Sequence, residues 1–302
     1  MARTWLQDAR LLDPLAREPL AGCLLIEDGR IAERFPAGAT APADARPMSL
    51  KGRSVAPGFL DLHYHGRLIF LEPEAAAEEI SQTARRLLAH GVTGFLPTTV
   101  AWPHERLLAH VAAWSELCDA RHSRPEAAAN VLGLHLEGPW IRPEAAGAQP
   151  AAAIRPYEPA AGRAILDRGE GTIRMVTFAP EVAGAAGLQE ELVRRGIVGA
   201  LGHSHAALEH ANAAMGAGAT HVTHLFNAMG GIHHRSVGLA GIALSEDRLT
   251  CDLICDGVHV HPDVVRLAAR AKGDRLALIT DRLEPVAGPT PDDGAGAAAN
   301  FG

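Results

Sequence analysis

The first fifty-odd residues alternate between short apolar runs and turn residues. The runs are "TWLQDARLLD" (4–13), "GCLLIEDGRIAERF" (22–35) and "MSLKGRSVAPG" (48–58), with Gly and Pro at their borders. Apolar runs of this length between turn residues are typical of β-strands. The Asp-Gly pair within "EDGR" (27–30) is a strong signal for a tight hairpin. The pattern therefore predicts a small β-module over residues 1–55.

From Val55 onward the pattern changes to apolar strand-like segments with helical patterns between most of them. Helical patterns at 73–91 and 262–273 begin at a proline and end at a glycine, and a third at 188–196 ends at a glycine. This alternation predicts an α/β fold, a (β/α)8 barrel, over residues 56–282. An open doubly wound sheet is the alternative, but no GxGxxG turn follows the first strand to support it. The eight strand candidates are 55–65, 92–100, 130–138, 172–180, 197–204, 221–229, 250–259 and 275–281.

The pattern ends after Asp281. The segment "RLEPVAGPTPDDGAGAAANFG" is rich in Gly, Ala and Pro and has no periodicity. Such a composition predicts a flexible tail, which we place at residues 283–302.

Polar side chains stand where several predicted strands end. The carboxyl ends of parallel barrel strands meet at one rim, where active sites are built. In "DLHYHG" (61–66), two histidines separated by one residue project to the same face of their strand. Each residue alone also fits an ordinary role as a loop cap or a hydrogen-bonded core side chain. Together they indicate a shared site, because buried ionisable groups are costly unless paired or metal-bound. The six residues are His63, His65, Glu137, His203, His224 and Asp281.

This set of side chains suits a particular chemistry. Imidazole and carboxylate together favour a divalent transition metal, Zn²⁺ or Fe²⁺. A bound metal lowers the pKa of its water to about 7. A carboxylate that is not a ligand can then accept the proton of the water and pass it to a leaving group. Asp281 fits that task, and the predicted reaction is hydrolysis of an amide or a related bond.

Composition narrows the possible partners and compartment. The formal net charge of −7 and the lack of a basic tract argue against a nucleic-acid-binding surface. No apolar stretch approaches about 18 residues, and the N-terminus has no secretory pattern, so we expect no membrane span. The four cysteines form no CxxC pair and are expected to be free, buried thiols. A reducing compartment, the cytoplasm, is therefore predicted.

Seven motifs occur in an order that resembles the N-acetylglucosamine-6-phosphate deacetylases of the amidohydrolase superfamily. They are "PGFLDLHYHG", "GLHLEGPW", "GHSHA", "THLFNAM", "GLAG", "DGVHV" and "ITD". The resemblance covers about residues 50–281 and, more weakly, the N-terminal strands. It implies a barrel of the metallo-dependent hydrolase type with a small β-sandwich module. It also implies hydrolysis of the acetamide of N-acetylglucosamine 6-phosphate to glucosamine 6-phosphate and acetate.

The resemblance also implies roles for individual residues. Asp281 matches the catalytic acid/base, and His63 and His65 match a pair that holds a second metal in some members. The resemblance therefore implies one or two metal ions per chain. Arg235 is the natural phosphate partner, because a guanidinium offers forked donors. The partners implied are a small sugar phosphate and a second copy of the chain in a homodimer. The main metal ligands are Glu137, His203 and His224, and the substrate-contacting positions are Ala148, Gln149, Asn227, Ala228, Arg235, Asp256, Gly257 and His259.

Two departures from the family pattern change the expectations. Gln149 stands where the family usually has a histidine that helps to polarise the substrate carbonyl. An amide donates a hydrogen bond but never carries a proton charge, so lower activity or a different acyl group is expected. The family also continues well past the Asp281 strand, with a closing helix and strands that complete the small module. We therefore expect an incomplete β-sandwich, whose open edges favour association.

Rival interpretations remain. Amidohydrolases of the dihydroorotase or hydantoinase kind use a carboxylated lysine on strand four, but "TIRMVTFAP" has no lysine, and Lys51 and Lys272 lie elsewhere. A catalytically impaired or inactive homologue that binds a sugar phosphate or a partner is an alternative from another class. A deacetylase for a related N-acetyl-hexosamine 6-phosphate is a third.

Overall fold

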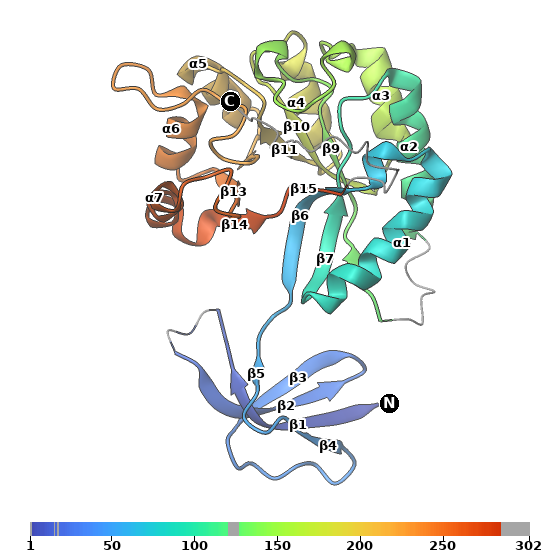
Figure 1. Ribbon diagram of the computed structural model, residues 1–302, viewed down its shortest axis with the longest axis vertical. Helices are drawn as coiled ribbons and strands as arrows, with labels where there is room; N and C mark the ends of the chain where they lie inside the picture. Colours follow the sequence, from blue (N-terminus) through green and yellow to red (C-terminus); the bar gives the residue numbers. More distant parts are fainter. Residues whose placement is uncertain (1, 15, 17, 120–126, 285–302) are drawn as a thin grey trace, which may run out of the picture. The chain divides into compact units, whose positions relative to one another are not determined.

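The chain divides into two compact units, residues 1–59 and 60–302. The computed structural model describes residues 2–14, 16, 18–119 and 127–284 (Figure 1). Most of the tail expected at 283–302 therefore lies outside the described residues.

The first unit is a single mixed β-sheet with strand order β3-β2-β1-β4, in which β5 also pairs with β1. The hairpin predicted at "EDGR" joins β2 to antiparallel β3, and its two central residues, Asp28 and Gly29, have φ of 48° and 78°. Positive φ at both positions is what a two-residue hairpin loop of type I′ requires. A β-sandwich has two sheets, and the described residues of this unit form one of them. The strands are β1 (Arg3–Leu11), β2 (Leu20–Glu27), β3 (Arg30–Pro36), β4 (Arg46–Ser49) and β5 (Ser54–Val55).

The second unit is a ring of parallel strands made of two hydrogen-bonded sheets (Figure 1). One has the order β14-β13-β12-β11-β10-β9 and the other the order β15-β6-β7-β8. A parallel bridge between Thr98 and His135 joins them. Each of the eight predicted segments contains a strand, so the barrel prediction is confirmed. The strands are β6 (Phe59–Gly66), β7 (Val92–Pro97), β8 (Asn130–Val131), β9 (Leu134–Glu137), β10 (Ile173–Phe178), β11 (Val198–Leu201), β12 (His221–Val222), β13 (Thr250–Ile254), β14 (Leu276–Ile279) and β15 (Arg282–Leu283).

The eighth strand of the ring is split, and the split positions part of the site. Its first piece, β14, pairs with β13, whereas its second piece, β15, pairs with β6 and closes the ring. Thr280 and Asp281 lie between the two pieces. The backbone N–H of Asp281 donates to the carbonyl of His63 over 2.9 Å, so the last strand reaches the first at the level of the histidines. The pairing of β15 continues across the boundary expected at residue 282.

Helices cover the outside of the strands (Figure 1). The helices predicted at 73–91, 188–196 and 262–273 correspond to α1, α4 and α7. An apolar core that includes the fully buried Phe95 and Trp114 packs between strands and helices. The helices are α1 (Pro73–Ala89), α2 (His104–Asp119), α3 (Pro159–Arg168), α4 (Ala185–Arg194), α5 (Leu208–Gly216), α6 (Gly238–Ser245) and α7 (Pro262–Lys272), with short 3₁₀ turns η1 (Leu68–Phe70), η3 (Pro143–Ala145), η4 (Ala151–Ala153) and η5 (Gly273–Arg275).

Two further expectations concern the state of the cysteines and the presence of a membrane-spanning helix. All four cysteines are free, as predicted. The expectation that all are buried is wrong for Cys255, which is exposed at the end of β13, where the chain leaves the barrel wall. Among the described helices, none combines the length and the apolar character that crossing a membrane requires.

Candidate metal centre

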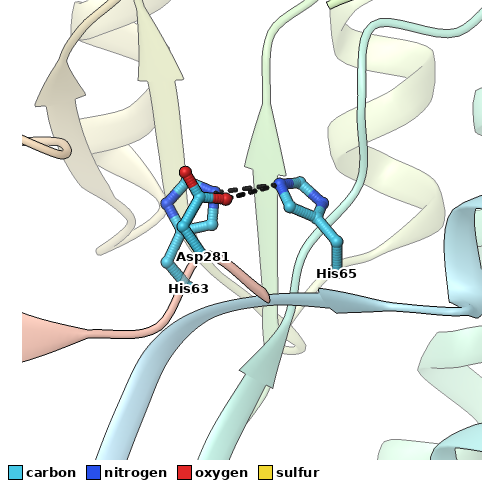
Figure 2. Close-up of side chains that lie close together, drawn as sticks. All are labelled: His63, His65 and Asp281. Carbon is cyan, nitrogen blue, oxygen red and sulfur yellow. Dashed lines mark hydrogen bonds and ion pairs between the residues drawn. The ribbon is translucent and has the colours of Figure 1, made fainter. Parts of the chain in front are cut away.

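The two histidines of β6 point to the same side of the strand and meet Asp281 there. The Nε2 atoms of His63 and His65 lie 3.1 Å apart. Asp281 Oδ1 lies 3.3 Å from the first and 3.2 Å from the second (Figure 2). Tyr64, between the histidines, faces the other way and packs edge-on against Phe95. The alternation of a strand thus places both imidazoles in the barrel mouth.

A second triad stands beside the first and is built by three other strand ends. Glu137 ends β9, His203 follows β11 and His224 follows β12. Glu137 Oε1 lies 3.0 Å from each histidine Nε2, and the two Nε2 atoms are 3.0 Å apart. The second carboxylate oxygen of Glu137 lies 3.1 Å from His65 Nε2, so this residue connects the two triads.

Both triads fit a bound transition metal. Ligands about 2.0 Å from a tetrahedral ion lie about 3.3 Å from one another, close to the spacing seen here. Each imidazole nitrogen carries at most one proton, so three nearly equal contacts cannot all be hydrogen bonds. The ring Nδ1 atoms of His65 and His203 face the carbonyls of Thr98 and Ala145 at 3.0 and 2.8 Å. A proton on each Nδ1 leaves the Nε2 lone pair directed at the centre, as in metal-binding histidines.

The carboxylates and histidines of the two triads shift one another's pKa values toward the charged forms. Burial lowers the pKa of His65, but the hydrogen bonds and charges of Asp281 and Glu137 outweigh it and raise this pKa to about 10. Burial likewise lowers the pKa of His224, but Glu137 above all raises it to about 9. Burial raises the pKa of Glu137, but His63 and the other histidines bring it well below its usual value. The carboxylate is therefore ionised, and a metal ion competes with protons for the imidazole nitrogens.

Three of the six residues have an unusual backbone. His203, His224 and Asp281 have φ of 47°, 33° and 47°. An L-residue in this left-handed region costs about 1–3 kcal/mol, and such residues cluster at functional sites. Each follows the end of a strand, where the chain turns away from the barrel wall. The strained turn is what directs the side chain into the mouth.

Two buried carboxylates outside the triads, Asp61 and Asp252, form hydrogen bonds with residues at this rim. The sequence analysis did not identify either of them. Asp61 Oδ2 accepts the hydroxyl of Thr280 over 2.6 Å, and its Oδ1 accepts the backbone N–H of His63 over 3.3 Å. Burial raises the pKa of Asp61. Asp252 belongs to β13 and is fully buried. Burial raises the pKa of Asp252, but the adjacent His221 ring lowers this pKa below its usual value. A charged residue inside an apolar strand is the signal that could have identified each.

A cavity of about 510 Å³ opens onto the two triads. Of the expected substrate contacts, it is lined by Ala148, Gln149, Asn227, Ala228 and His259, together with candidate metal ligands from both triads.

Gln149 is held tightly in this cavity. Its Nε2 donates to Glu137 Oε2 over 2.5 Å, and its Oε1 accepts the backbone N–H of Ala101 over 2.7 Å. Both ends of the amide are thus engaged with the protein.

Three expected substrate contacts do not line the cavity. Asp256 and Gly257 are exposed at its edge, and the carboxylate of Asp256 lies 2.7 Å from His259 Nδ1. Slight burial raises the pKa of Asp256, but hydrogen bonds from Val258 and His259 lower it to about 2. Arg235 is exposed on the loop before α6. Asp256 therefore orients His259, and Arg235 is free of the cavity wall of its own chain.

A ring of eight strand positions that carries two His–carboxylate triads at the carboxyl ends of its strands is typical of barrel-type metal-dependent hydrolases. The family model described as "Amidohydrolase family" matches residues 54–290. The chain belongs to the amidohydrolase family. Neither lysine lines the cavity, and Lys272 Nζ instead donates to the carbonyl of Glu246 over 2.8 Å, so the carboxylated-lysine alternative finds no support.

Individual relatives narrow the comparison. The chain is 37% identical over 291 residues to N-acetylglucosamine-6-phosphate deacetylase from Homo sapiens, covering 92% of this chain and 65% of that protein. It is 35% identical to the Bacillus subtilis enzyme of the same name, covering 87% of this chain and 66% of that protein. The chain thus spans about two thirds of the length of these curated relatives.

Solved structures agree with the sequence comparison. A variant of N-acetyl-D-glucosamine-6-phosphate deacetylase from Mycobacterium smegmatis, in complex with N-acetyl-D-glucosamine-6-phosphate, superposes with a TM-score of 0.80 at 33% identity. The match covers 94% of this chain and 72% of that chain. The enzyme of the same name from Pasteurella multocida also gives a TM-score of 0.80, at 28% identity, with 93% and 72% covered.

Proposed function

We propose that the protein hydrolyses the acetamide of N-acetylglucosamine 6-phosphate to glucosamine 6-phosphate and acetate, as part of amino-sugar breakdown. The observation that carries this proposal is the pair of triads that Glu137 connects, with members of both in the wall of one cavity. Bound Zn²⁺ or Fe²⁺ would supply a Lewis acid and lower the pKa of a water molecule. Glu137, His203 and His224 would hold the main ion, and His63 and His65 a second one, with Asp281 beside them.

The residues around this centre supply the remaining steps. Burial raises the pKa of Asp281, but the charges of His63 and His65 lower it well below its usual value, so the carboxylate is ionised. It can accept a proton from the attacking water and deliver it to the amide nitrogen. The water oxygen bonds to the carbonyl carbon, the carbon–nitrogen bond breaks, and acetate and the free amine leave.

Substrate orientation is proposed for side chains of the cavity wall and its edge. Ala148, Gln149, Asn227, Ala228 and His259 line the cavity and would contact the sugar and its acetyl group, with Asp256 and Gly257 shaping the adjoining loop. Arg235 is exposed and does not line the cavity of its own chain, so we propose that it binds the phosphate in a second copy within a homodimer. Free thiols are consistent with a cytoplasmic location.

The test is acetate release by the purified chain supplied with Zn²⁺ or Fe²⁺. N-acetylglucosamine 6-phosphate should be hydrolysed, and the same chain stripped of metal should be inactive. N-acetylgalactosamine 6-phosphate is the second candidate, because the chain is 32% identical to a protein named N-acetylgalactosamine-6-phosphate deacetylase from Escherichia coli O157:H7. Binding of both sugar phosphates without release of acetate would identify an inactive homologue and refute the enzymatic proposal.

A further inference from the structure

The four histidines of the triads are held in place in two different ways. His65 and His203 are held through their rings, because each Nδ1 faces a backbone carbonyl. The Nδ1 atoms of His63 and His224 are buried and have no hydrogen-bond partner in the described part of the chain. Each triad therefore contains one histidine whose ring has no outer hydrogen bond to fix its orientation.

In each of these two histidines, the backbone N–H instead donates to a buried aspartate. Asp61 accepts the N–H of His63, as described above. Asp252 Oδ1 accepts the N–H of His224, and the carbonyl of Asp252 accepts the N–H of Leu225 over 2.8 Å. One residue of β13 thus binds two consecutive N–H groups at the point where the chain leaves β12. This is also the point where His224 adopts its positive φ.

Asp252 is itself anchored through its other carboxylate oxygen. Its Oδ2 lies 3.0 Å from His221 Nε2, and His221 Nδ1 lies 2.7 Å from the hydroxyl of Thr250. Asp252 is 0% exposed and is not among the residues that line the cavity. A buried charge is costly unless it is paired and hydrogen-bonded. The hydrogen bonds that stabilise the Asp252 carboxylate come from His221 and from the backbone N–H of His224.

We propose that Asp252, anchored by His221, is a positioning residue that fixes His224 for metal binding. The inference rests on the metal site of the proposed function. Without an acceptor, the buried N–H of His224 would be left unpaired and its strained backbone would relax. Its Nε2 would then move out of the triangle with Glu137 and His203. Within the described residues, the ring of His224 has no outer hydrogen bond that would prevent this movement.

The experiment measures Zn²⁺ affinity of the full chain by competition with a chromophoric chelator, without measuring turnover. Asp252→Ala should raise the Kd of the weakened site about 10- to 100-fold, the effect typical of removing an outer partner. Asp252→Asn keeps an oxygen for the His224 N–H and should stay within about threefold of wild type. His221→Ala should have an intermediate effect, and adding it to Asp252→Ala should cause no further loss, because residues acting as one unit are not additive.

The control is Glu79→Gln, which removes another buried carboxylate, one that pairs with Arg86 on α1. It should change stability and leave the Zn²⁺ affinity unchanged. A Kd for Asp252→Ala within threefold of wild type in a folded chain would overturn the inference, as would an Asn variant as weak as the Ala variant. If Asp252→Ala does not fold, an unchanged Kd in His221→Ala overturns it equally. A wild-type chain that binds no Zn²⁺ would refute the metal site itself, and the inference with it.

Discussion

Asp281→Asn separates two roles that the geometry gives to one carboxylate. Asp281 Oδ1 completes a triangle with the Nε2 atoms of His63 and His65, and it is also the ionised group proposed to move the proton. Asparagine has nearly the same shape. The backbone N–H of residue 281 still reaches the carbonyl of His63, and Thr280 still bonds to Asp61. The substitution therefore removes the charge and the proton acceptor, while the backbone of the rim stays in place.

The expected magnitude follows from these two losses. Without a proton acceptor, kcat should fall about 10²- to 10⁴-fold, which corresponds to about 3 to 5 kcal/mol of transition-state stabilisation. The site at His63 and His65 exchanges an anionic oxygen for a neutral one, and its affinity should fall by at least about tenfold. The triad of Glu137, His203 and His224 does not include Asp281, so its metal should be retained.

The assay is acetate release at increasing Zn²⁺, with metal content measured in parallel. At saturating metal the lost ligand is compensated, whereas a lost proton acceptor is not. The reasoning is refuted if saturating Zn²⁺ restores the activity of Asp281→Asn to the wild-type level, because Asp281 would then act as a ligand alone. Asp247→Asn, which changes an exposed carboxylate, is the matched control and should behave as wild type.

Three further predictions concern the metal centre and the phosphate. His63→Ala combined with His65→Ala should lower the metal content without abolishing binding at the second triad, as elemental analysis can show. In the metal-free protein, the pKa of His65 near 10 and that of His224 near 9 lie above the ordinary 6.5. Their contribution to stability should therefore be complete below about pH 6.5 and disappear as the pH rises through 9 to 10, which denaturant unfolding at each pH measures. Arg235→Ala should raise the KM for the 6-phosphate and leave the non-phosphorylated sugar almost unchanged, because only the phosphate forms a charge-assisted pair.

Controls decide each of these predictions. Loss of all metal from the double histidine variant would show that the two triads bind as one unit. Metal-free stability that rises between pH 7 and pH 10 would contradict the sign of the titration. Arg270→Ala on α7 is the control for Arg235→Ala, and equal effects of Arg235→Ala on both sugars would mark that residue as structural. After a size measurement has established a dimer, mixing Arg235→Ala with Asp281→Asn should restore activity if the arginine acts across the interface.

The sequence predicted the parts of the molecule that depend on local pattern. The strand periods, the turn at Asp28 and Gly29, and the polar ends of the strands all follow from residue order and the geometry of a parallel barrel. The split in the eighth strand could not be predicted from the sequence, because the apolar pattern of "RLALITD" gives no sign of a break at Thr280. The role of Asp252 could not be predicted either. It depends on β12 and β13 lying side by side, so that the N–H of His224, just past the end of β12, meets a carboxylate on β13.

The split strand also makes closure of the barrel and assembly of the metal centre a single event. Thr280 and Asp61 are hydrogen-bonded although 219 positions separate them in the sequence, and Asp281 completes the first triad just beyond this contact. An ion held there would act as a clasp between the first and last strands. A ribosome must therefore release nearly the whole barrel before this triad can form. In the metal-free protein, amide hydrogen exchange should be fastest along the seam between β6 and β15, where, among the described residues, the short pairing of β15 and its neighbours holds the ring shut.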